Sequence, residues 1–291
     1  MIAPRAAFSL SLPGGRPPLL LGARTLVMGV LNVTPDSFSD GGKAFDPQQA
    51  LDLALAMEAA GADVIDVGAE STRPGAAELT GRQERARLMP VLRLLHRVRV
   101  PLSIDTTKAD VARFGLDEGV SLLNDISGLQ YDLGVGDIAA ARGAPLVLMH
   151  MRGRPADMYA HARYDDVATE VTRDLTRALE RAVSRGVPWE QLVVDPGLGF
   201  AKRGEHSAAA LAGVASLAAL GRPVLVGPSR KSFLADAAGG APAAERDWPT
   251  AAAVTAAVLA GAHVVRVHAV PEMVQVVRAA DMIREHGTDS R

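Results

Sequence analysis

Short apolar runs recur along the chain, and polar segments with helical periodicity lie between many of them. The runs are rich in Val, Ile and Leu and are as short as typical strands. They cover residues 26–32, 63–67, 101–105, 121–125, 145–150, 192–195, 223–227 and 263–268. Apolar residues return every three or four positions in segments 47–60, 108–118, 165–184 and 272–283, as in amphipathic helices. The pattern predicts strands and helices that alternate throughout.

The strand runs are apolar almost throughout, which is typical of a parallel sheet that is covered on both faces. From Asn32 to His268 the strand ends are spaced by about 34 residues on average, which suits strand–helix units. Eight such units make a (β/α)8 barrel. A doubly wound open sheet is the alternative, but it usually carries G-x-G-x-x-G after its first strand, and residues 33–42 lack it. We predict an α/β protein with a single (β/α)8 TIM barrel domain.

Prolines and glycines interrupt the first 23 residues and leave no apolar segment of the kind found in signal peptides. We predict a short N-terminal hairpin or arm over residues 1–23 and the barrel over 24–287. The longest run of small apolar residues, 251–265, is broken by Thr255 and His263, and it is shorter than the roughly 20 residues that a membrane span needs. We therefore predict a cytoplasmic protein with no membrane partner.

Charge and cysteine content exclude several classes of function. The chain has 31 Lys+Arg against 33 Asp+Glu, a net charge of −2, and 48% hydrophobic residues. This balance argues against a nucleic-acid binder, which usually has a basic face, and the apolar content suffices for a large core. The absence of cysteine excludes disulfides, thiolate nucleophiles and cysteine-based zinc sites.

The predicted strands end in polar residues, although apolar strands have no structural need of them. A barrel places its chemistry at these carboxyl ends. The residues concerned are Asn32, Glu70 to Arg73, Asp105, Asn124, Asp125, His150, Asp195, Ser229 to Lys231, Arg266 and His268. A single Asn or Asp after a strand is often only a turn former or a helix cap, but convergence of so many on one rim indicates a site. Asp66, inside the run 63–67, would be a buried carboxylate in need of a partner, and is a candidate to support the rim.

The rim residues fall into two chemical groups. Asp105, Asn124 and Asp195 offer acceptors and an amide, which suit a planar heterocycle with a row of N–H donors, such as a 2-amino-4-oxopyrimidine. Positive charge and free amides suit an anion such as a phosphate or carboxylate. This second group comprises Arg73, Lys231, Arg266, His268 and the amides of a predicted helix after Ser229. We expect one pocket that holds a donor-rich ring together with an anion.

Eight motifs lie at the eight predicted strand ends. They read MGVLNVTPDSFSDGG (28–42), DVGAESTRPGA (66–76), SIDT (103–106), NDI (124–126), LMHM (148–151), DPGLGF (195–200), SRK (229–231) and RVH (266–268). In content and order they resemble the motifs of dihydropteroate synthases, folate-pathway enzymes that join a pterin to p-aminobenzoate. The resemblance extends from about residue 27 to residue 270.

The resemblance implies a barrel enzyme, usually a homodimer, that condenses 6-hydroxymethyl-7,8-dihydropterin diphosphate with p-aminobenzoate and releases pyrophosphate. It implies that the pterin is held by Asp105, Asn124, Asp195 and Lys231, with Ile126 and Met149 lining its slot. For the diphosphate it implies Mg2+ at Asn32 and contacts from Thr72, Arg266 and His268, beside Arg73 of the cationic group. For p-aminobenzoate it implies walls from Phe38, Pro74, Phe200 and the stem of Lys231, with Ser232 and a helix N-terminus at the carboxylate. The groups nearest the chemistry would be Lys231, Arg266 and His268, and the loops 34–42 and 71–75 would act as lids.

Some positions depart from the usual pattern. Ala269 stands where the family has an Asp after Arg-Val-His, which puts the orientation of His268 in question, and Ser207 replaces a common Asn. Arg152 and Arg154 are expected to add positive charge at the barrel mouth. Two other functions stay open. A pterin-barrel methyltransferase that acts on methyltetrahydrofolate and a corrinoid protein could share the acceptors but has no diphosphate to bind. A non-catalytic paralogue is suggested by Ala269.

Overall fold

Parallel strands form a closed barrel in the computed structural model of the chain, which describes residues 2–34, 46–72 and 76–288. Within these residues the barrel strands are β3 (Leu26–Asn32), β4 (Val64–Gly68), β5 (Leu102–Asp105), β6 (Leu122–Asp125), β7 (Leu146–Met149), β8 (Leu192–Asp195), β9 (Leu225–Val226) and β10 (Val264–Val267). Each strand from β3 to β8 pairs with the next, and β10 pairs with both β3 and β9. A parallel bridge between Val194 and Val224 closes the ring. The barrel prediction is confirmed, and the open-sheet alternative is wrong.

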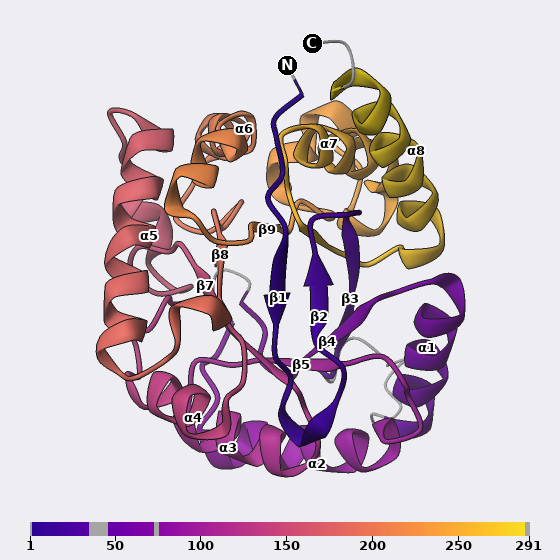
Figure 1. Cartoon of the computed structure of the whole chain (residues 1–291), viewed down its shortest axis with the longest axis vertical. Helices are drawn as coiled ribbons and strands as arrows, with labels where there is room; N and C mark the ends of the chain where they lie inside the picture. The colour runs from indigo at the N-terminus through magenta and orange to yellow at the C-terminus, as the bar shows by residue number, and fades with distance from the viewer. Residues whose placement is uncertain (1, 35–45, 73–75, 289–291) are drawn as a thin grey trace.

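Helices surround the barrel in chain order (Figure 1). They are α1 (Pro47–Ala60), α2 (Gly81–Leu95), α3 (Ala109–Asp117), α4 (Gly134–Arg142), α5 (Val167–Ser184), α6 (Gly204–Ala212), α7 (Asp247–Leu259) and α8 (Val270–Thr288). Local signals set their ends. For example, the Asp46 carboxylate accepts the Gln48 amide at the start of α1, and Gly61 ends that helix at a φ of 101°, a conformation that favours glycine.

The predicted strands and helices match these elements, with small differences at their ends. Helix α8 extends further in both directions than the predicted 272–283, whereas β9 is only two residues long against the predicted 223–227. Pro223 has no amide hydrogen and cannot donate to a strand ladder, although its carbonyl accepts the Val194 amide at 3.0 Å. The missing amide hydrogen of Pro223 accounts for the late start of β9, and the bridge between Val194 and Val224 keeps the barrel closed.

Alternation along the strands builds the barrel interior in two layers. An apolar layer fills its lower part and includes Met28, Val64, Leu122, Val147, Val193, Leu225 and Val264. Side chains two positions further along a strand face the same way. Those positions are Val30, Asp66, Asn124, Met149, Asp195, Gly227 and Arg266. The barrel interior is therefore apolar in its lower layer and largely polar in the layer nearer the carboxyl ends of the strands.

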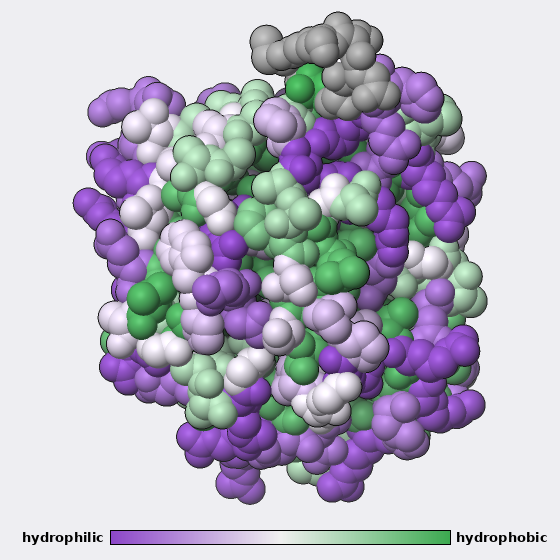
Figure 2. All heavy atoms as spheres, viewed as in Figure 1, coloured by the Kyte–Doolittle hydropathy of each residue, from purple (hydrophilic) through white to green (hydrophobic). Residues whose placement is uncertain are grey.

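An antiparallel hairpin covers the amino-terminal end of the barrel (Figure 1). It consists of β1 (Phe8–Leu10) and β2 (Leu19–Leu21), in agreement with the predicted N-terminal hairpin. Leu10, Leu12 and Leu21 are buried against the apolar layer of the interior, so the hairpin is part of the core. Figure 2 shows apolar and weakly polar side chains in the middle of this face and hydrophilic ones around its edge. None of the described helices is long and apolar enough to cross a membrane.

Candidate active site

Arg266 joins the polar ends of four strands. From β10, its Nε donates to Asp66 Oδ2 on β4 at 2.7 Å and its Nη2 donates to Asp105 Oδ2 on β5 at 3.0 Å. The amide Nδ2 of Asn124, on β6, donates to the same Asp66 oxygen at 2.9 Å. Asp66 is completely buried, and these contacts satisfy its Oδ2, whereas its Oδ1 has no hydrogen-bond partner. Arg266, Asp105 and Asn124 therefore form one network, as the strand-end prediction required.

Burial shifts the pKa values of three rim residues in the direction that favours their uncharged forms. Burial raises the pKa of Asp105 to about 7, with Arg266 opposing the shift. Burial likewise raises the pKa of Asp195 to about 6, although its Oδ1 accepts the Gly197 amide at 2.7 Å. Burial and the nearby Arg266 lower the pKa of Lys231 to about 8. Perturbed groups gathered in one cleft are a mark of functional sites.

Lys231 lies against an aromatic wall. Its Nζ is 4.0 Å from the centre of the Phe200 ring, within the range of a cation–π contact. The backbone of Gly199 runs alongside, and a Cβ there would lie 3.2 Å from Lys231 Cδ. Phe200 also packs on the apolar cluster that contains Ile126 and Met149. The residues that were predicted to line the pterin slot and the p-aminobenzoate site are thus neighbours.

His268 is oriented by a serine. The hydroxyl Oγ of Ser229 accepts the His268 backbone amide at 3.2 Å and lies 2.9 Å from His268 Nδ1. Burial and the charge of Arg266 lower the pKa of His268 to about 3, so the imidazole is neutral at pH 7. The serine hydrogen is then available to Nδ1, which leaves a hydrogen on Nε2. Ser229 therefore orients His268 although Ala269 replaces the usual Asp.

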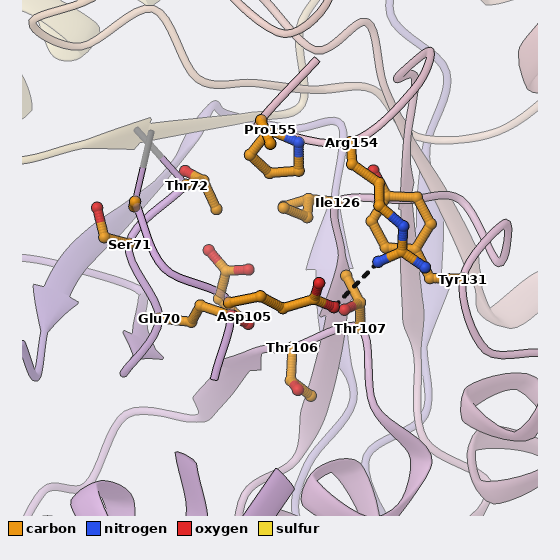
Figure 3. A pocket seen from close by; sticks show the side chains of 13 residues that line it. Glu70, Ser71, Thr72, Asp105, Thr106, Thr107, Ile126, Tyr131, Arg154 and Pro155 are labelled. Carbon is orange, nitrogen blue, oxygen red and sulfur yellow. Dashed lines mark hydrogen bonds and ion pairs between the residues drawn. The ribbon is translucent and has the colours of Figure 1, made fainter. Parts of the chain in front are cut away.

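A cavity opens beside Asp105, between the loops that follow four neighbouring strands (Figure 3). Its lining includes the predicted site residues Thr72, Asp105 and Ile126. Over one side, the Arg154 guanidinium stacks at 4.3 Å on the Tyr131 ring, and it donates to Glu78 at 3.0 Å. Arg154 is therefore paired with an acid.

Arg152 is paired as well. Its guanidinium bonds to Asp174 at 2.6 Å and to Glu170 at 2.9 Å. With both arginines facing carboxylates, the surplus of positive charge expected at the mouth is largely neutralised. That expectation was wrong, because the partners come from the loop before α2 and from α5, which residue spacing does not reveal.

The other predicted site residues fall at different places. Asn32 ends β3, opposite Gly68 of β4. Ser232 begins a 3-10 turn, Ser232–Leu234, with Lys231 at its N-cap, and a second 3-10 turn, Asp236–Ala238, follows it. The predicted α-helix at this point is wrong: Gly239, with positive φ, ends the segment, and the next α-helix starts at Asp247. Phe38, Arg73, Pro74 and most of the two predicted lid loops lie outside the described residues.

Lys202 is a site feature that sequence reasoning missed. It is 1% exposed, whereas a lysine in a loop is normally solvated. Its Nζ contacts His150 Nδ1 at 2.7 Å and the carbonyl oxygens of Gly197 at 3.1 Å and Phe200 at 3.2 Å. Its position two residues after the motif DPGLGF was the one available signal.

The barrel and its rim place the chain among pterin-binding enzymes, and the sequence model of the family described as "Pterin binding enzyme" matches residues 28–268. A dihydropteroate synthase of Synechocystis sp. is 41% identical over 277 residues, which are 95% of this chain and 96% of that protein. The chain belongs to the dihydropteroate synthase family.

Two solved structures agree with this assignment. A Xanthomonas albilineans dihydropteroate synthase with 4-aminobenzoic acid has a TM-score of 0.87 at 36% identity, over 96% of this chain and 99% of the other. The same enzyme in complex with 7,8-dihydropteroate has a TM-score of 0.83 at 33% identity, over 94% and 99%.

Proposed function

We propose that this protein condenses 6-hydroxymethyl-7,8-dihydropterin diphosphate with p-aminobenzoate to give 7,8-dihydropteroate and pyrophosphate, a transfer of a pterin-methyl group. The observation that carries the proposal is the network in which Arg266 links Asp66 and Asp105, beside Asn124. It puts hydrogen-bond acceptors for a pterin next to a cation for a diphosphate. The related enzyme with 4-aminobenzoic acid and with 7,8-dihydropteroate supports the same substrates and product.

Asp105, Asn124, Asp195 and Lys231 bind the pterin in this proposal. The carboxylates accept hydrogens from the ring amino and N–H groups, and the amide and ammonium donate to its carbonyl and ring nitrogen. Ile126 and Met149 lie in an apolar cluster and would form the walls of a flat slot. The contact of Asp105 with Arg266 at 3.0 Å keeps an acceptor close to the anion site.

The diphosphate lies on the cationic side of the rim, with contacts from Thr72, Arg73, Arg266 and His268. As the carbon–oxygen bond breaks, its electron pair stays on the departing diphosphate oxygen. The charge of Arg266 and the Nε2–H of neutral His268 stabilise that negative charge. The electron-rich pterin spreads the positive charge left on its exocyclic carbon, so the reaction has substantial SN1 character.

The amine of p-aminobenzoate then forms the new bond to that carbon and releases a proton. An aniline nitrogen is already nucleophilic, so no strong general base is needed. In this proposal Phe38, Pro74, Phe200 and the stem of Lys231 enclose the ring. Ser232 and the amides of its short turn bind the carboxylate. Exclusion of water from the cation favours attack by the amine over hydrolysis.

Magnesium belongs to the same proposal, with Asn32 as its protein ligand. The described residues contain no group of three or more His, Cys, Asp or Glu side chains that could hold a metal. Mg2+ is often bound by only one or two protein oxygens together with substrate phosphates and water. The amide oxygen of Asn32, at the end of β3, fits that donor set, and the ion would neutralise charge on the diphosphate.

Oligomeric state, location and domain division remain predictions. We expect a homodimer, as the family resemblance implies, and the exposed apolar residues Trp248 of α7 and Met282 and Ile283 of α8, at 87%, 57% and 51% exposure, are candidates for its interface. Light scattering would give the mass of the assembly, and cell fractionation would test the cytoplasmic location. The division into an arm, 1–23, and a barrel, 24–287, is tested by truncation.

The proposed function is tested by pyrophosphate release from the pterin diphosphate and Mg2+, with and without p-aminobenzoate, beside Lys231→Ala. We expect release that depends on p-aminobenzoate and is lost in the variant. Binding of the pterin diphosphate without release would instead indicate a non-catalytic paralogue. A protein that does not bind it but transfers a methyl group from methyltetrahydrofolate would be the methyltransferase.

A further inference from the structure

The loop between β8 and α6, residues 196–203, contains no helix or strand. Gly197, Gly199 and Ala201 have φ values of 65°, 79° and 49°, three left-handed residues within five positions. For alanine this conformation is uncommon and costs energy. A Cβ at Gly197 would meet the His150 carbonyl oxygen at 2.1 Å, so the loop lies directly on the end of β7. Such a loop needs contacts from other residues to hold its shape.

Side chains from the end of the loop and from outside it satisfy its carbonyl groups. Lys202 Nζ donates to the carbonyl oxygens of Gly197 at 3.1 Å and of Phe200 at 3.2 Å. The hydroxyl of Tyr164 donates to the Ala201 carbonyl at 3.0 Å. The Phe200 amide also donates to the Gly197 carbonyl at 3.1 Å, so Lys202 reinforces a turn that this backbone bond closes and adds a bond to the Phe200 carbonyl. Its loss would leave two carbonyls near the rim without this donor.

The third contact of Lys202 ties the loop to β7 and α5. Its Nζ lies 2.7 Å from His150 Nδ1, and His150 Nε2 lies 3.3 Å from Asp174 Oδ2. Burial lowers the pKa of Lys202 to about 7 and that of His150 to about 4. The ammonium donates to both carbonyls and to Nδ1, with the hydrogen of the neutral imidazole on Nε2, facing Asp174, and a neutral amine still keeps two hydrogens for the two carbonyls. The two carbonyl contacts therefore do not depend on the charge of Lys202.

The loop carries contacts to both halves of the rim. At its start, the Gly197 amide donates to Asp195 Oδ1 at 2.7 Å. At its other end, the Phe200 ring lies 4.0 Å from Lys231 Nζ. The Asp195 contact uses an amide next to a strand end, whereas Phe200 depends on the path of the whole loop. Release of the loop should therefore move Phe200 more than Asp195.

We propose that Lys202 is a positioning residue for p-aminobenzoate, because its Nζ holds the Gly197 and Phe200 carbonyls and so keeps the Phe200 ring against Lys231. The inference rests on the proposed function, in which Phe200 is one wall of the p-aminobenzoate site. Lys202 itself touches neither substrate.

Lys202→Met tests the inference, since methionine keeps much of the side-chain volume and removes the donor. We expect KM for p-aminobenzoate to rise by about tenfold or more, as for other small displacements of a site. We expect kcat and the Kd for the pterin diphosphate to change by less than about threefold, the pattern of lost ground-state binding. Assays run at a temperature at which circular dichroism shows each variant to be folded.

Arg5→Met is the matched control. Arg5 is a second buried cation, with a side chain 3% exposed and bonded to Asp281 at 3.1 Å, but it lies beside the N-terminal hairpin. A loss of thermal stability without a change in KM is expected there. If Arg5→Met raises KM for p-aminobenzoate as much as Lys202→Met does, the effect is general loosening and the inference is wrong.

Restoration of the ammonium gives a second test. The chain has no cysteine, so Lys202→Cys can be unfolded, alkylated with 2-bromoethylamine at that one thiol and refolded, with wild type taken through the same steps. Recovery of KM is expected after alkylation. No recovery, or a crystal structure of Lys202→Met with Phe200 still on Lys231 and an unchanged KM, would overturn the inference. Failure of the proposed function would instead appear as no turnover by wild type. The position of Phe200 in the crystal structure of Lys202→Met would then be the remaining test of whether Lys202 holds the loop.

Discussion

Asp66 offers the strongest test of how the barrel interior supports the site. Its completely buried carboxylate accepts hydrogen bonds from both Arg266, at 2.7 Å, and Asn124, at 2.9 Å. Asp66→Asn keeps the shape and removes the charge. Two residues of the proposed substrate site would then share a neutral amide oxygen in place of a carboxylate oxygen.

The size of the effect follows from the contacts that remain. Removal of one partner of a buried ion pair typically costs about 3–5 kcal/mol. Arg266 keeps its contact with Asp105 at 3.0 Å, so we expect a smaller loss in the free energy of unfolding, about 2–3 kcal/mol. If a similar energy is lost from transition-state binding, kcat/KM for the pterin diphosphate falls by about 30- to 150-fold.

Urea unfolding and steady-state kinetics measure the two quantities. Asp117→Asn is the control, because Asp117 pairs with Arg142 at the surface, where the side chains are 53% and 41% exposed, and such pairs contribute less than about 1 kcal/mol. An Asp66→Asn enzyme with kcat/KM within about threefold of wild type would refute the reasoning, since Arg266 and Asn124 would then not need this carboxylate.

Three further predictions test other parts of the account. Ser229→Ala removes the partner of His268 Nδ1, and we expect kcat to fall about tenfold in pyrophosphate-release assays; an unchanged kcat would show that His268 is oriented otherwise. The pH profile of kcat/KM for the pterin diphosphate should rise as Asp105 loses its proton near pH 7 and fall as Lys231 does so near pH 8, and an acid limb that persists in Asp105→Asn would contradict this assignment. Deletion of residues 1–23 uncovers the barrel core that the hairpin buries, so we expect urea unfolding to show a loss of more than about 3 kcal/mol; equal stability would mean that the arm is separate from the barrel.

The sequence was sufficient for the barrel and for most of its rim, because both follow from local periodicity. Apolar runs at regular spacing indicate strands covered on both faces. Polar residues at their ends, such as Asp105 and Asn124, mark the side of the barrel on which chemistry takes place. The period of two also orients Asp66 inwards without any knowledge of its partners.

Contacts between segments that are distant along the chain could not be predicted from the sequence. The partner of His268 is Ser229, 39 residues earlier, and the ring nitrogen beside Lys202 belongs to His150, 52 residues earlier. Neither pairing follows from spacing or residue type. The helix predicted at Ser232 is instead two short 3-10 turns, and Gly239 and Gly240, which both have positive φ, end the segment.

The central claim, that one rim joins a pterin to p-aminobenzoate, is tested most directly by the product itself. Wild-type protein would be incubated with the pterin diphosphate, Mg2+ and ring-13C p-aminobenzoate, and the products measured by mass spectrometry and a pyrophosphate assay. The account predicts 7,8-dihydropteroate that carries the labelled ring, in equal amount to the pyrophosphate. Pyrophosphate released without labelled dihydropteroate, or no reaction at all, would contradict it.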